Sequence, residues 1–277
     1  MVRSLFHNKV AAVSAVIIII IAALAVLAPY ITPYDAYRQD LSVRLNAPGA
    51  GHIFGTDELG RDVLARLLTG TRVSLIIAMI PTALAVLLGT VLGIAGAFFG
   101  GVPDTVITWL VDVTLAFPGM LLAMVIMYTF GGNMSSVVLA IVVMECGSIA
   151  RIVRSVTLSI LETDYILAAK AMGAKKTAIT MRHILPNLLP TLIVLFTLNI
   201  PGSILSESAL SFLGIGIQPP DVSLGLMVSG ARSFLFQMPH LSLIPSGMIM
   251  ILVLAFNFLG DALRDILDPK LKDQDHE

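Results

Sequence analysis

Charged residues and cysteine are scarce in this sequence. Only 13% of its 277 residues are Asp, Glu, Lys or Arg, and the net charge at pH 7 is −1. No basic run is longer than the pair Lys175 and Lys176, so a nucleic-acid-binding surface is not expected. The single cysteine, Cys146, excludes an internal disulfide framework and the usual cysteine-based metal sites. The five histidines are scattered, with no pair at helical ligand spacing, and we therefore expect no metal site.

Apolar residues are abundant instead. They make up 57% of the chain, and the mean hydropathy is +0.93. A soluble domain has roughly 45–50% apolar residues, and one core of this size cannot bury the excess, so lipid is the expected solvent. Apolar runs long enough to cross a bilayer occur at residues 10–28, 73–101, 105–130, 134–150, 187–206 and 241–260. The sequence therefore predicts an all-α transmembrane protein with about six spans.

The first and third runs have special features. Residues 10–28 form an apolar run longer than the roughly 7–15 residues of a signal-peptide core, so we expect a retained span. The third run contains Asp112 and Pro118, and the proline predicts a kink. Asp112 is close enough to the expected membrane surface to pair with Arg151 or Arg154.

The distribution of basic residues predicts the orientation. If the N-terminus is cytoplasmic, the 17 Lys and Arg residues divide into eleven on the cytoplasmic side and six on the other. Cytoplasmic loops carry the excess of Lys and Arg in membrane proteins. We therefore expect both termini in the cytoplasm.

Residues 29–72 are too polar to cross a membrane. They separate the first span (1–28) from a core of five spans (73–277) and contain five acidic residues and five arginines. We expect an extracytoplasmic cap held by ion pairs, with Asp57, Arg61 and Asp62 as its central residues. The alternative is a solvated loop whose surface ion pairs contribute only about 0–1 kcal/mol each. Residues 61–68 alternate like an amphipathic helix and suggest an interfacial piece.

The polar stretch 151–186 is much longer than a connection between two spans requires. Its small residues Ala168, Ala169 and Ala171 would let another surface approach a helix backbone closely. Gly173 can adopt the positive φ that ends a helix. We expect a short helix presented to a partner on the cytoplasmic face; an ordinary amphipathic surface helix is the alternative.

Four motifs then resemble one family, the permease subunits of ABC importers in the peptide and nickel branch. YILAAKAMG (165–173) with RHILPN (182–187) resembles the loop that docks into the ATPase subunit. In ABC-importer permeases in general, this loop begins Glu-Ala-Ala and has an Ile at a later position. This chain has Leu167 in place of the Glu and His183 in place of the Ile, and both departures are typical of the peptide and nickel branch. FGTDELGRDVLAR (54–66), LSFLGIGIQPP (210–220) and NFLGDALRD (257–265) with LDP (267–269) resemble dipeptide and oligopeptide permeases of the C-subunit type.

The resemblance implies a type I importer fold in a bacterial or archaeal plasma membrane. It implies a homologous permease partner, two ATPase subunits and an extracytoplasmic substrate-binding protein. ATP and Mg²⁺ would bind the ATPases, because this chain lacks a Gly-x-x-x-x-Gly-Lys-Ser/Thr loop and is expected to bind no cofactor. The residues expected to contact the ATPase are Glu162, Asp164, Tyr165, Ala168, Ala169, Ala171, Gly173 and Lys175.

The function expected is that of a transport subunit rather than an enzyme. Dipeptides or oligopeptides are the expected cargo, and nickel chelates or other small solutes are the alternative within the family. Candidate residues for the translocation path are Phe117, Met120, Met124 and Glu145, although helix packing also explains a carboxylate or an apolar stripe in a span. A secondary transporter, which usually shows an internal repeat of spans, and a membrane anchor are the rival classes.

Overall fold

The computed structural model describes residues 9–267 and is almost entirely helical in that range. The helices that could span a membrane are α2 (Lys9–Val26), α4 (Val63–Phe99), α7 (Met134–Leu161), α10 (Leu185–Phe212) and α12 (His240–Leu267). The shorter ones are α3 (Ala28–Ile31), η1 (Leu41–Val43), α5 (Gly101–Ala116), α6 (Gly119–Phe130), α8 (Asp164–Ala171), α9 (Lys176–Ile179), the π-helical turn η2 (Thr180–Ile184), α11 (Leu224–Ala231) and η3 (Arg232–Phe234). Five helices are therefore long and apolar enough to cross, or six if the bent pair α5–α6 is one span.

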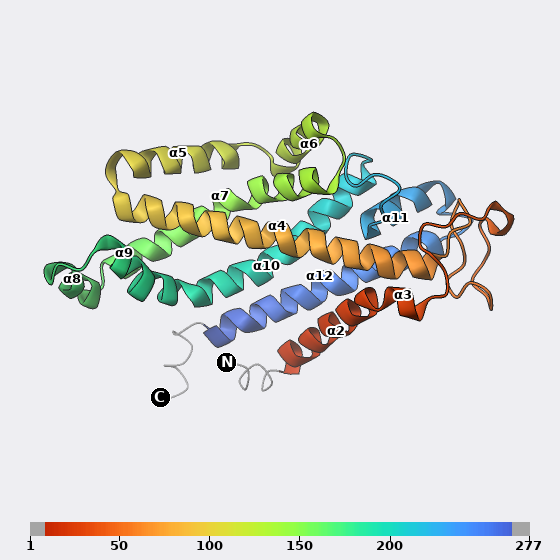
Figure 1. The fold of residues 1–277 in the computed structure, drawn as a ribbon, viewed down its shortest axis with the longest axis horizontal. Helices are drawn as coiled ribbons and strands as arrows, with labels where there is room; N and C mark the ends of the chain where they lie inside the picture. The colour runs from red at the N-terminus through yellow and green to blue at the C-terminus, as the bar shows by residue number, and fades with distance from the viewer. Residues whose placement is uncertain (1–8, 268–277) are drawn as a thin grey trace.

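The long helices lie side by side and connect two ends of different character (Figure 1). The loop between α3 and α4 lies at one end together with α11, and we call residues 32–62 the cap. At the other end lie α8 and α9, and we call residues 162–184 the α8 segment. α2 runs toward the cap and α12 runs back from it, so the described chain starts and finishes toward the α8 end.

The predicted third span is broken. α5 and α6 meet at an angle of 91° around Phe117 and Pro118, whereas we expected only a kink in one span over 105–130. Phe117 is extended, with φ −87° and ψ 140°, because a residue before proline is pushed out of the helical region. α5 also begins at Gly101, so the turn expected over 100–104 is confined to the two glycines with positive φ.

Two of the expected span limits are wrong in an informative way. α4 begins at Val63 rather than at residue 73, so the boundary placed at 72 falls inside a continuous helix. The piece expected to lie along the membrane surface at 61–68 is therefore largely the first turns of that helix. α7 continues to Leu161 instead of ending near residue 150, so part of the polar stretch 151–186 extends a span.

The most extensive packing between described helices joins α4 to α7. A Cβ atom on Gly93 would lie 2.7 Å from the Ala150 carbonyl oxygen and 2.8 Å from the Val153 Cβ atom. Gly89, one turn earlier, faces Ile149 in the same way, with a Cβ-to-Cγ2 separation of 2.7 Å. Small residues four apart let membrane helices approach to backbone contact. This pair therefore forms the centre of the bundle.

Candidate functional site

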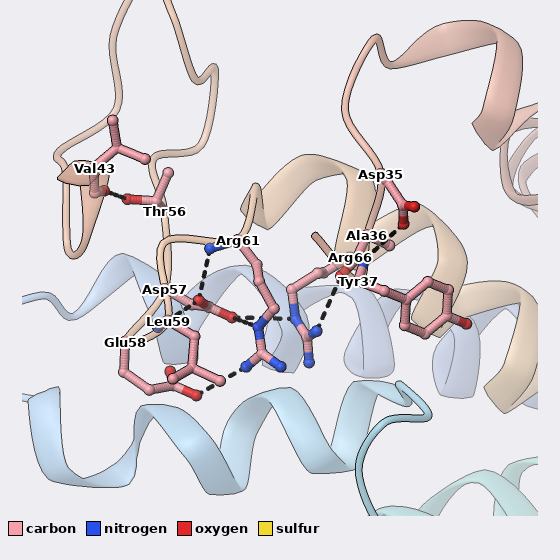
Figure 2. A network of polar contacts seen from close by, with 10 residues as sticks. All are labelled: Asp35, Ala36, Tyr37, Val43, Thr56, Asp57, Glu58, Leu59, Arg61 and Arg66. Atoms are coloured by element: carbon pink, nitrogen blue, oxygen red, sulfur yellow. Dashed lines mark hydrogen bonds and ion pairs between the residues drawn. The ribbon is translucent and has the colours of Figure 1, made fainter. Parts of the chain in front are cut away.

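The cap is organised around the carboxylate of Asp57. Its Oδ1 atom accepts hydrogen bonds from the backbone N–H groups of Leu59 (2.9 Å) and Arg61 (3.0 Å). Its Oδ2 atom lies 2.7 Å from Nε of Arg61 and 3.3 Å from Nε of Arg66 (Figure 2). All three side chains are nearly buried. Buried charges are normally paired and hydrogen-bonded, and Asp57 meets that requirement through four N–H groups from three residues.

The two arginines extend the network in different directions. Nη1 of Arg66 donates to the carbonyl oxygen of Ala36 (3.1 Å), which ties α4 to the start of the cap. Nη2 of Arg61 donates to Oε1 of Glu58 (3.0 Å). Asp57 and Arg61 were expected at the centre of the cap, but Arg66 was not; it is buried although it lies in α4.

Asp62 has a separate role. Its Oδ2 atom accepts from the backbone N–H of Ala65 (2.8 Å) and so caps the start of α4. Its Oδ1 atom lies 2.9 Å from Nδ1 of His52, whose ring stacks on Tyr34 with centroids 4.5 Å apart. This carboxylate therefore fixes the junction between the cap and the longest helix.

The cap backbone depends on glycine at one position above all. Gly60 has φ +71°, and a Cβ atom there would collide with the carbonyl group of Asp40. Asp40 in turn accepts hydrogen bonds from the hydroxyl (2.6 Å) and backbone N–H (3.0 Å) of Ser42. These two bonds lower the pKa of the Asp40 carboxyl group below its ordinary value. Local hydrogen bonds and a left-handed residue thus set the course of this loop.

The opposite end of the bundle is built differently. In the α8 segment only the inner face is buried, where Ile166 packs with Ile149 and Val153 of α7 and Ile184 of η2. Gly173 has φ +80° and ends the turn after α8, as expected, and no atom lies within 4 Å of a Cβ built on it. The conformation of the chain, rather than crowding, therefore requires glycine here.

Most residues expected to contact the ATPase lie on the exposed side of this segment. The exposed ones are Glu162, Asp164, Tyr165, Ala168, Ala171, Gly173 and Lys175. Ala169 is the exception and that expectation is corrected, because its side chain is buried, one turn from Ile166 on the inner face of α8. The exposed surface also includes two apolar side chains that were not among the expected ATPase contacts, Leu167 (49% exposed) and Met172 (82% exposed).

The candidates for a translocation path do not form one surface. Phe117 is exposed at the break between α5 and α6, whereas Met120 and Met124 pack against a buried cluster with Ala140 of α7 and Leu210 of α10. The exposed face of α6 is instead lined by Leu121, Val125 and Tyr128. Helix packing thus explains Met120 and Met124 in this chain.

Glu145 lies among hydroxyl groups rather than beside a cation. The Ser203 hydroxyl of α10 donates to Oε1 of Glu145 (2.5 Å) and lies 2.7 Å from the Thr82 hydroxyl of α4. The Oε2 atom is buried without a hydrogen-bond partner among the described residues. Asp112 differs, since its carboxylate is paired with Arg151 at 2.6 Å, one of the two partners expected.

A second buried carboxylate was missed. Glu207 is completely buried in α10, where it accepts from Ser211 (2.7 Å) and Ser74 of α4 (3.4 Å). The Ser74 hydroxyl also accepts from the backbone N–H of Leu224 (3.1 Å), so the cluster anchors the start of α11. Polar residues recur at intervals of four, at positions 203, 207 and 211, and this spacing indicates one face of a helix. We missed it because the predicted fifth span ended at residue 206.

Residues 9–267 contain no group of three or more His, Cys, Asp or Glu side chains that could hold a metal ion. The functional candidates are therefore the buried ion-pair network of the cap at one end of the bundle and the short, exposed helix α8 at the other. A continuous helix, α10, begins next to the α8 segment and reaches the cap end.

Comparison with known proteins gives two matches to family models. Residues 85–273 match the family described as "binding-protein-dependent transport system inner membrane component". Residues 1–48 match the "N-terminal TM domain of oligopeptide transport permease C".

Individual relatives agree with these families. A glutathione transport system permease protein of Pectobacterium atrosepticum is 40% identical over 98% of this chain and 90% of its own length. A dipeptide transport system permease protein of Haemophilus influenzae is 40% identical over 96% of this chain and 92% of its own. Among solved structures, the inward-facing methionine ABC transporter matches with a TM-score of 0.60 and 18% identity, over 73% of this chain and 96% of that one. This last likeness concerns the fold.

Proposed function

Because the chain belongs to the family of binding-protein-dependent transport system inner membrane components, we propose that it imports short peptides as one half of a permease pair driven by two ATPase subunits. It is a multi-pass inner-membrane permease subunit of an ABC importer with a type I fold, and a transport component rather than an enzyme. An extracytoplasmic binding protein delivers the peptide, and ATP and Mg²⁺ bind on the ATPases.

The exposed face of the α8 segment is the observation that supports coupling between the ATPase subunits and the permease. The segment presents an exposed helix with apolar side chains at its tip, such as Leu167 and Met172, while only its inner face packs on the bundle. Large exposed apolar side chains gathered on one surface indicate a site for a partner protein. The ATPase subunit is the partner whose position this segment suits.

Movement of α8 would be passed to two long helices. Glu162 and Thr163 alone connect α7 to α8, and the turn η2 leads directly into α10. α7 is in turn linked to α5 by a bidentate ion pair between Arg154 and Asp104, with distances of 2.7 and 2.6 Å. Closure of the ATPases on α8 would therefore displace α7, α10 and α5 together.

The cargo proposal rests on the relatives. The two relatives described above are named for transport of dipeptides and of glutathione, itself a short peptide. The family matched at residues 1–48 is that of an oligopeptide permease. We therefore assign short peptides as the cargo of this chain in preference to nickel chelates.

The test is uptake by the assembled importer in proteoliposomes. We expect a labelled dipeptide to accumulate only when ATP, both permeases, the ATPases and the binding protein are all present. Excess unlabelled dipeptide should abolish the signal, and a nickel chelate should leave it unchanged. Uptake by the permease alone, driven by an ion gradient, would support a secondary transporter and contradict this function.

The orientation is tested separately. Cysteines introduced as Asn46→Cys in the exposed part of the cap and Lys175→Cys in the α8 segment, both in a Cys146→Ser background, should react from opposite sides of the membrane. We expect a membrane-impermeant reagent added outside intact cells to label the first and not the second. Labelling of both from outside would overturn the proposed topology.

A further inference from the structure

A pocket of about 210 Å³ lies between the cap and α11. One wall consists of the charged side chains of Asp57, Glu58, Arg61 and Arg66, and the opposite wall is formed mainly by α11. Figure 2 shows both guanidinium groups in this region, with the α11 ribbon running beneath them. The pocket is at the cap end, away from the α8 segment.

The charged wall has unused hydrogen-bonding capacity. Asp57 is fully engaged by three hydrogen bonds and by the ion pair with Arg66. Arg61 uses Nε and Nη2, and Arg66 uses Nε and Nη1, so each guanidinium group keeps one terminal nitrogen without an acceptor among the described residues. Glu58 accepts through Oε1 and has a second oxygen free. Two donors and one acceptor are thus available to a ligand.

The chemistry of these free groups selects a ligand class. A carboxylate is the natural partner of paired guanidinium nitrogens, and an ammonium group is a natural partner of the free Glu58 oxygen. The four charged side chains sum to zero, so a ligand that carries both charges leaves the buried site neutral, whereas a simple anion or cation does not.

The rest of the pocket is apolar and small. Val63, Leu226 and Leu241 contribute to its walls, which suits the side chain of an amino-acid residue. Its volume is below the roughly 300–1,000 Å³ of pockets for drug-sized ligands. A single amino acid or the end of a short peptide fits that description.

We propose that this pocket binds a zwitterionic amino acid or short peptide, with a carboxylate at Arg61 and Arg66 and an ammonium group at Glu58. This inference rests on the proposed peptide function and adds a site to it. The pocket would receive a peptide at the cap end of the permease, before the peptide moves along the bundle.

The test uses protection of a cysteine in the pocket wall. Gly230 of α11 lines the pocket, and a Cβ atom there would lie at an ordinary contact distance of 3.5 Å from Oε1 of Glu58, so Gly230→Cys fits without displacing the carboxylate. The protein is the full chain in its assembled complex, in lipid nanodiscs without the binding protein and with Cys146→Ser. The reagent is the small, neutral methyl methanethiosulfonate.

We expect the dipeptide alanylalanine to slow modification of this cysteine. The rate should fall by the factor 1 + [L]/Kd, which is about tenfold at a peptide concentration ten times Kd. N-acetylalaninamide, which carries no charge, should not slow it. A cysteine at Phe236, whose side chain is 99% exposed, serves as the control and should react at the same rate with and without peptide.

The variant Glu58→Gln tests the end of the pocket assigned to the ammonium group. It keeps an oxygen for Arg61 but loses the negative charge that would pair with the ammonium group, so protection by alanylalanine should weaken. Three results would each overturn the proposal: no protection by alanylalanine, equal protection by N-acetylalaninamide, or protection by alanylalanine that is the same in Glu58→Gln as in the unsubstituted site. If ATP-driven peptide uptake is normal and protection is absent, only this site is wrong; if protection occurs without such uptake, the proposed function is wrong instead.

Discussion

The two ends of this bundle differ in how they bury their side chains. In the cap, Asp57 and Arg61 are nearly buried and bonded to each other and to nearby backbone groups. In the α8 segment, the acidic and apolar side chains of the outer face, including Leu167 and Met172, point to solvent. The charges at the centre of the cap are therefore paired within one chain, whereas the outer face of the α8 segment is left exposed.

This difference separates structural effects from functional ones. A substitution of Asp57, at the centre of the cap network, should change the stability of the chain itself. A substitution on the exposed face of α8 should change association with the ATPase and leave the chain stable. α10 connects the two regions, from the turn η2 to the buried cluster around Glu207.

The largest effect is expected for Asp57→Ala. This change leaves Arg61 and Arg66 buried without their common counter-ion, and breaking a buried pair in this way costs about 3–5 kcal/mol. We expect a clear fall in the thermal unfolding midpoint of the full chain in lipid nanodiscs. The control is Asp221→Ala, at an exposed position. Equal midpoints for the two variants would show that the cap network does not stabilise the protein.

An intermediate effect is expected for Gly173→Val. A β-branched residue at φ +80° introduces strain of about 1–3 kcal/mol, although nothing nearby would collide with its Cβ atom. Because the strain is confined to the α8 segment, substrate-stimulated ATP hydrolysis by the complex should fall more than the unfolding midpoint does. Gly173→Asn should retain most of the hydrolysis, since Asn tolerates this conformation. Equal losses for Val and Asn would mean that the backbone conformation is not what matters.

The smallest effect on the chain itself is expected for Leu167→Asp. The side chain is half exposed on α8, so the unfolding midpoint should stay unchanged while association with the ATPase weakens by about 1–2 kcal/mol. Ala169→Trp is the contrasting variant, since its buried position should make it destabilise α8 through overpacking, at about 1–3 kcal/mol. Co-purification and thermal unfolding measure the two effects. Loss of chain stability in Leu167→Asp would contradict the assignment of an outer face.

The sequence predicted features that depend on local chemistry. Long apolar runs predicted the spans, and the breaking of a helix at Gly173 followed from the residue itself. Pro118 predicted a disturbance in the third span but not its angle, because a bend of 91° depends on the packing of α5 and α6 against α7.

Features that depend on tertiary contacts were missed or misplaced. Ala168 and Ala169 have the same side chain, and only the fold, which turns the face of α8 that carries Ile166 toward the bundle, decides that the second is buried. The alternation of charged and apolar residues made 61–68 look like a surface helix, yet Arg66 is buried, paired with Asp57 and hydrogen-bonded to the backbone of Ala36, which lies 30 residues earlier in the sequence. Glu207 was placed outside the fifth span, because its serine partners on α4 and α10 come together only in the folded chain.

The central claim, that the α8 segment is the contact with the ATPase, is tested most directly by cross-linking. A thiol-reactive benzophenone would be attached at Met172→Cys in the α8 segment, or at Ile53→Cys in the cap, each in a Cys146→Ser background. Both positions are exposed, at 82% and 63%, so both should accept the label. On illumination of the assembled complex, the account predicts a covalent adduct with the ATPase subunit from position 172 and none from position 53. An ATPase adduct from position 53, with none from position 172, would contradict it.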